Sequence, residues 1–256
     1  MNFKKTMFAL AVGSVGIVGA VSAQAAAVNN GDTLTIQTPT FNQYGYVNAG
    51  TGSYFAMDTN GDGIFKAAER TALSQGATGL VIGTTTSPGA SHGGAPAAGD
   101  TNAIDAPWNF FKNTGSDFLV SPVTGDTTSG LNFSGWRVTW NGIPSINMGG
   151  GIQNCGTTSD GICINPASGA DIGGTFNNGT GIAAFAWDGV YGHTYTIDYA
   201  ATVPQADASG FGGVGYQLHL QGTVMQAAAV PEASTYGMML AGLGLVGFAV
   251  RRRKLV

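Results

Sequence analysis

Charged side chains are scarce in this sequence, and basic ones are nearly missing from its middle. Only 9% of the 256 residues are Asp, Glu, Lys or Arg, and six of the ten Lys and Arg lie at residues 4–5 and 251–254. Residues 26–229 keep four basic residues against thirteen acidic ones, a net charge of −9. Nucleic-acid binding needs a basic footprint, so we expect no nucleic-acid partner.

Cysteine and histidine are also rare, with two and three residues respectively. Cys155 and Cys163 lie eight positions apart in a turn-rich segment with no histidine nearby, which argues against a zinc site. In an oxidising compartment such a pair predicts a local disulfide. Closing a nine-residue loop stabilises the folded chain by roughly 2.5 kcal/mol in the chain-entropy account.

The first 25 residues have the layout of a signal peptide. Lys4 and Lys5 precede an apolar run from residue 7 to 21, and Ala23-Gln24-Ala25 provides small residues at the positions that signal peptidase requires. We predict cleavage after Ala25, with Ala23 and Ala27 as alternatives. The mature chain would then begin near residue 26, outside the cytoplasm.

The last 27 residues, 230–256, also combine a short motif, an apolar run and a basic cluster, but the basic cluster comes last. Val230-Pro231-Glu232 precedes an apolar run at 236–250, and Arg251, Arg252, Arg253 and Lys254 follow it. A helix of fifteen residues covers about 22 Å, whereas the hydrocarbon core measures roughly 30 Å. We therefore expect a helix that anchors the chain in the inner membrane only transiently, with its basic end in the cytoplasm.

This order of Val-Pro-Glu, apolar helix and Arg cluster resembles the PEP-CTERM sorting signal of Gram-negative bacteria. Ala233 departs from the commonest form, which has a second Pro there. The resemblance covers about a tenth of the chain. It implies cleavage by a membrane protease of the exosortase type, with Pro231, Glu232 and the Arg cluster as the sorting residues. It also implies a cell-surface or extracellular location, often in a biofilm matrix.

The middle of the chain, residues 26–229, reads as one β-rich extracytoplasmic domain. Gly accounts for 42 residues of the chain, and Ser, Thr and Asn separate apolar segments that alternate or are rich in β-branched residues. These features predict an all-β fold, an antiparallel β-sandwich or jelly-roll-like domain, with one short helix from Lys66 to about Ser74. The predicted strands are 33–38, 79–86, 117–121, 135–141, 182–187, 193–203 and 214–224.

Residues 58–69 match the twelve-residue calcium loop of EF-hands. The side chains of Asp58, Asn60 and Asp62 supply alternating oxygens, Ile64 offers its carbonyl, and Glu69 closes the loop as a bidentate ligand. Ca²⁺ is the one cofactor we predict, bound with the modest affinity of extracellular modules and serving to order this segment.

Two departures limit the calcium prediction. Lys66 occupies position nine, where an oxygen-bearing residue is common, and the preceding segment 48–57 is too rich in Gly for the entering helix of a full EF-hand. The unit loosely resembles half of a dockerin. An Asp/Asn/Gly turn that caps a helix is the alternative, although it leaves Glu69 unexplained.

Other patterns carry less weight. Gly89–Gly93 spells a nucleophile elbow around Ser91, but a Gly/Ala/Pro loop follows it instead of a helix. His193 and His219 are expected on polar strand faces. Trp136, Val138 and Trp140 share one face of a strand, which favours core packing over an exposed sugar-stacking platform.

These observations favour a non-enzymatic surface or matrix protein that calcium stabilises. The partners we expect are signal peptidase, the exosortase-type protease and matrix polysaccharide. A calcium-dependent carbohydrate-binding module is the alternative. An extracellular hydrolase fits least, since no nucleophile or acid–base constellation stands out.

Overall fold

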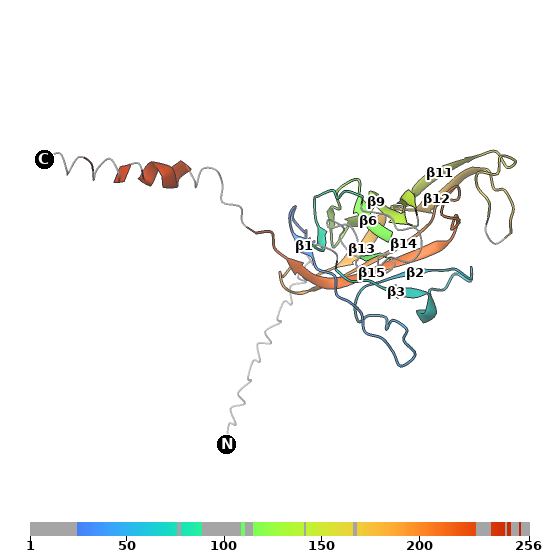
Figure 1. Ribbon diagram of the computed structural model, residues 1–256, viewed down its shortest axis with the longest axis horizontal. Helices are drawn as coiled ribbons and strands as arrows, with labels where there is room; N and C mark the ends of the chain where they lie inside the picture. Colours follow the sequence, from blue (N-terminus) through green and yellow to red (C-terminus); the bar gives the residue numbers. More distant parts are fainter. Residues whose placement is uncertain are drawn as a thin grey trace, which may run out of the picture.

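The computed structural model is built almost entirely from antiparallel β-strands (Figure 1). It describes residues 25–75, 78–88, 109–110, 115–140, 142–165, 168–228, 237–243, 245–246 and 251. The signal segment therefore lies outside the described residues, apart from Ala25.

The larger sheet has nine strands in the order β3-β2-β15-β14-β13-β8-β7, and β1 pairs with both β15 and β4. Its centre is the pair β14 and β15, which stay in register from Thr194 opposite Thr223 to Thr202 opposite Gly215. The strands are β1 (Thr33–Leu34), β2 (Tyr54–Met57), β3 (Arg70–Ala72), β4 (Leu80–Val81), β7 (Gly125–Asp126), β8 (Gly130–Asn132), β13 (Ile182–Ala186), β14 (Thr194–Thr202) and β15 (Gly215–Met225).

A second sheet has four strands in the order β10-β9-β6-β5. Its strands are β5 (Asn109–Phe110), β6 (Gly115–Leu119), β9 (Trp136–Trp140) and β10 (Ile143–Asn147). A separate two-stranded hairpin, β11 (Gly151–Gly156) with β12 (Gly174–Gly179), projects from the body and is called the arm below (Figure 1).

The main core lies between the two sheets and is centred on Trp136 of β9, which is fully buried. Its ring meets those of Phe55 in β2, Tyr199 in β14 and Tyr216 in β15 at centroid distances of 6.3, 6.1 and 6.0 Å. Because edge-on aromatic contacts add to the effect of area burial, this cluster ties the four-stranded sheet to the centre of the larger one. The expectation that Trp136 and Val138 pack in the core is confirmed.

All seven predicted strand segments contain strands of the structure, and the alternation of β14 is the clearest case. Tyr195, Ile197 and Tyr199 are buried, while Thr194 and Asp198 on the other face are exposed. The turn 204–213 joins β14 to β15, as their sequences predicted. Among the described residues, the prediction missed β2, β3, β5, β7, β8, β10 and the two strands of the arm.

The predicted helix from Lys66 to Ser74 is wrong. A 3-10 turn at Ala67–Glu69 occupies its start, and Arg70–Ala72 then pairs as β3 with β2. The helix-forming residues of this segment favour an α-helix only weakly. Pairing with β2, which satisfies the backbone and places Leu73 in the core, overrides that preference.

The described part of the sorting tail contains a short helix at 237–243, and every residue of it is exposed. No helix within the described residues is long and apolar enough to cross a membrane. The membrane helix predicted at 236–250 is therefore not supported.

Candidate functional site

The candidate calcium loop connects the paired strands β2 and β3. Ala56 lies opposite Arg70 in this pair, so the strands bring Asp58 and Glu69 to the same end of the hairpin. The 3-10 turn at Ala67–Glu69 completes the connection. The fold thus gathers all the predicted ligands in one exposed loop at the edge of the larger sheet.

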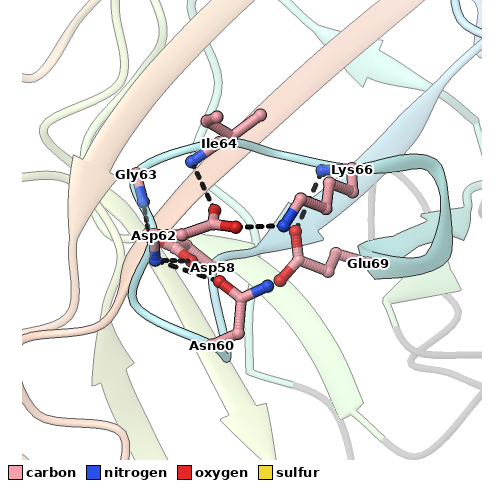
Figure 2. A network of polar contacts seen from close by, with 7 residues as sticks. All are labelled: Asp58, Asn60, Asp62, Gly63, Ile64, Lys66 and Glu69. Atoms are coloured by element: carbon pink, nitrogen blue, oxygen red, sulfur yellow. Dashed lines mark hydrogen bonds and ion pairs between the residues drawn. The ribbon is translucent and has the colours of Figure 1, made fainter.

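The side-chain oxygens of this loop bind its own backbone (Figure 2). Asp58 accepts hydrogen bonds from the N–H groups of Asp62 and Gly63, at 3.1 and 2.7 Å. Asn60 accepts a second bond from Asp62 N–H at 2.9 Å, and Asp62 accepts one from Ile64 N–H at 3.0 Å. Gly63 has φ +76, a value that an L side chain rarely adopts. These contacts form a tight turn.

Lys66 places its ammonium against Asp62. The hydrogen bond from Lys66 lowers the pKa of Asp62, and the same contact raises the pKa of Lys66. Glu69 Oε2 accepts the N–H of Lys66 at 2.9 Å, while Glu69 Oε1 is buried and has no hydrogen-bond partner among the described residues (Figure 2). Lys66 thus neutralises the carboxylate of Asp62, one of the predicted calcium ligands.

The residues present fit calcium in chemistry more than in arrangement. Carboxylate, amide and carbonyl oxygens are the ligands that calcium prefers, and Glu69 Oε1 is free to bind one. However, no group of three His, Cys, Asp or Glu in the described part of the chain is arranged to hold a metal ion. Calcium binding would require Lys66 to leave Asp62, and it stays a prediction.

His219 is buried, although the sequence predicted it on a polar strand face. It is only 8% exposed, so the surface interpretation of this histidine is wrong. Its Nδ1 lies 2.7 Å from Asp198 Oδ1, and its ring stacks on that of Tyr54 at 5.1 Å. The guanidinium of Arg70 lies 5.1 Å from the centre of the Tyr54 ring. Burial raises the pKa of Tyr54, against the opposing effect of Arg70.

The histidines do not form a joint acid–base site. His193 pairs instead with Asp188 at 2.7 Å on an exposed turn, where the hydrogen bond lowers the pKa of Asp188. His219 Nε2 is buried without a hydrogen-bond partner. A general base must reach the proton that it removes, and a buried Nε2 lacks that access. The sequence missed the Tyr54–Arg70 contact because β2 and β3 were not predicted.

Cys155 of β11 and Cys163 are joined by a disulfide, with their Cα atoms 5.2 Å apart. Both residues are fully buried. The bond closes the start of the connection between β11 and β12, so it belongs to the arm and not to either large sheet. Ser91, the serine of the nucleophile-elbow pattern, lies outside the described residues.

The chain matches one family model, the PEP-CTERM protein-sorting motif, at residues 229–254. Of the predicted sorting residues, Arg251 is described and exposed, and Pro231, Glu232, Arg252 and Arg253 lie outside the described residues. No curated protein and no solved structure matches the chain significantly. The motif identifies the chain as an exported protein that exosortase, a membrane protease, sorts.

Proposed function

We propose that the chain is a non-enzymatic cell-surface or extracellular-matrix protein, delivered through its PEP-CTERM tail and stabilised by calcium. The match to the sorting motif at 229–254 carries this proposal. The last strand of the β-domain, β15, ends at Met225, only a few residues before the motif. Cleavage in the tail would therefore leave every strand of the domain intact.

The exposed tail supports a temporary stay in the membrane. Met238, Leu240 and Leu243 are 75%, 66% and 62% exposed, and such a run of apolar side chains is unfavourable in water. Lipid would cover these side chains, while the cluster at 251–254 would stay in the cytoplasm. Because the apolar run is short, the cost of hydrophobic mismatch favours release after processing.

Mass spectrometry of the protein recovered from cells and from medium tests the sorting step. We expect the released form to start near residue 26 and to lack the apolar run and the basic cluster. An Arg251→Ala/Arg252→Ala/Arg253→Ala variant should accumulate unprocessed. Recovery of the intact tail in every fraction would contradict the proposal.

The calcium part of the proposal rests on Asp58, Asp62 and Glu69, three carboxylates in one short loop. Titration of the processed protein with CaCl₂ should raise its melting temperature. Lys66→Gln should strengthen binding, because it removes the ammonium that competes for Asp62. Asp58→Ala and Glu69→Ala serve as the loss-of-ligand controls. Absence of both heat and thermal shift in the wild type and in Lys66→Gln would reject the metal.

A further inference from the structure

A polar cleft lies at the base of the arm. It has a volume of about 360 Å³, near the lower end of ligand pockets, which span roughly 300–1,000 Å³. Strand β10, the first residues of β11, the end of β12 and the turn after β14 meet around it. The residues that line it are Ser145, Asn147, Gly150, Gly151, Ile152, Gln153, Asn178, Pro204, Ala206 and Asp207.

Asn178 in this cleft has an unused hydrogen-bonding group. Its side chain is 97% buried, since only 3% is exposed, and its carbonyl oxygen Oδ1 forms no hydrogen bond among the described residues. A buried acceptor without a donor costs about 1–3 kcal/mol. Oδ1 is itself closed to solvent, so a ligand hydroxyl in the cleft would reach it only after the Asn178 amide rotates toward the cleft. A hydrogen bond formed in this way would remove the cost.

Two further side chains supply complementary groups. Gln153 uses its Oε1 to accept the N–H of Gln205 at 2.6 Å, which fixes the side chain and leaves Nε2 as a donor. Asp207 uses its Oδ1 to accept the N–H of Ser209 at 2.8 Å, which leaves Oδ2 as an acceptor. Ser145 is exposed and adds a hydroxyl that can donate or accept. Residues with donors and with acceptors therefore line the same small volume.

The walls of the cleft are held in place before any ligand arrives. The bond from Gln205 N–H to Gln153 ties the turn at 204–207 to β11. Asn147 accepts the N–H of Gly149 at 2.9 Å, which orients its amide beside Gly150. Gly150 has φ +72, and a Cβ there would meet the backbone of Gly179 at 2.9 Å, so the two chains approach closely. A fixed site loses less entropy on binding.

The charge and polarity of the lining select the class of ligand. The lining contains no Lys or Arg and one acid, Asp207, which disfavours phosphate, sulfate and carboxylate groups. Its few apolar members, chiefly Ile152 and Pro204, are too small a surface for a lipid or a large aromatic ring. Amides, a hydroxyl and a carboxylate suit a compact ligand rich in hydroxyl groups.

We propose that this cleft binds one or two units of a neutral sugar, as a site separate from the loop at 58–69 and from Trp136. The inference goes beyond export and sorting, and it would make the β-domain a polysaccharide-binding module at its destination. It needs no calcium, because none of the loop ligands lines the cleft. Sugar hydroxyls donate to Asn178 and Asp207 and accept from Gln153 and Ser145.

A glycan array probed with the processed protein tests the proposal. The array should carry neutral hexose and pentose oligosaccharides beside uronic-acid and sulfated ones. Binding to a neutral oligosaccharide should persist in EDTA and fall at least tenfold in Gln153→Glu, which keeps an acceptor for Gln205 N–H but loses the amide donor. Gln43→Glu makes the same charge change on an exposed residue outside the cleft and should bind as the wild type does.

Asn178→Leu separates recognition from folding. Since Oδ1 has no partner in the free protein, this variant should keep its melting temperature while binding falls at least tenfold. The proposal is overturned if no neutral glycan binds, if acidic glycans bind better, or if Gln153→Glu and Asn178→Leu bind normally. Loss of binding in Tyr44→Ala alone would also overturn it and would place the sugar on the exposed hairpin at 41–47. Tail processing is measured separately, so failure here leaves the sorting proposal standing.

Discussion

Gly222, in the middle of β15, allows a neighbouring backbone segment to approach closely because it has no Cβ atom. Residues 35 and 37 donate backbone hydrogen bonds to Thr223 and Gln221, so the segment after β1 runs directly beside this glycine. A Cβ at Gly222 would lie 1.8 Å from the carbonyl oxygen of Thr35, which cannot move without breaking those bonds. Only glycine allows the approach.

Gly222→Ala should therefore destabilise the protein by about 1–3 kcal/mol or more. Gly215→Ala in the same strand is the matched control, because a Cβ there meets nothing closer than 3.9 Å. Urea denaturation of both variants measures the difference. Equal midpoints for the two would show that the Thr35 segment shifts freely.

Burial also sets the chemistry of individual residues. His219 and Asp198 are opposite each other on β15 and β14, and the alternation of each strand had assigned its residue to the polar face. The same alternation assigned His219 to water, because the cover that buries it comes from Tyr54, far away in the sequence. Periodicity shows which residues share a face of a strand, but it does not show which other segments of the chain cover that face.

At the scale of elements, the arm is a hairpin that depends on local bonds. Among the described residues it pairs with no strand of the two larger sheets, and it is closed by the Cys155–Cys163 disulfide. Without that bond, loop-closure entropy lowers the stability of the arm by roughly 2.5 kcal/mol. The large sheets keep their own pairing, so we expect the loss to remain local.

A Cys155→Ser/Cys163→Ser variant tests this expectation. Hydrogen exchange should accelerate across residues 151–179, whereas the amides of β14 and β15 keep their protection. The intact protein should be two hydrogen atoms lighter than its reduced form by mass spectrometry. Equally faster exchange in β14 and β15 would mean that the arm is part of the global folding unit.

At the scale of the whole molecule, three tyrosines in the core link folding to pH. Burial raises the pKa values of Tyr195, Tyr199 and Tyr216, that of Tyr199 to about 12. In the unfolded chain these groups ionise near pH 10. Because the folded pKa values are the higher ones, the stability they contribute is present below about pH 10 and is lost as the pH rises further.

We therefore expect cooperative unfolding in alkali, followed by circular dichroism together with tyrosinate absorbance. The buried tyrosines should ionise only as the sheet signal disappears. Tyr199→Phe should move the transition to higher pH, while Tyr44→Phe should leave it unchanged. Ionisation of all tyrosines with intact circular dichroism would contradict this account.

The fold was predictable where its signal is local. Strands β14 and β15 alternate over nine or more residues, and both were placed nearly to their ends. Strands β2 and β3 were missed because YFAM has no polar alternation, being buried on both faces, and RTA follows residues that favour a helix. The cleft was unpredictable, since its lining comes from three stretches that lie apart in the sequence: 145–153, 178 and 204–207.

The sequence by itself determined the sorting motif at 229–254 and placed Asp58, Asp62 and Glu69 in one short loop, whose calcium binding stays a prediction. Both are patterns of charge, apolar length and spacing within one continuous segment of at most a few dozen residues. Only the tertiary structure decided that residues 70–72 form a strand, that Asp62 pairs with Lys66, that His219 is covered, and that Asn178 and Gln153 line one cleft. The physical reason is that strand pairing and burial join residues far apart in the chain, and no local pattern records which partners meet.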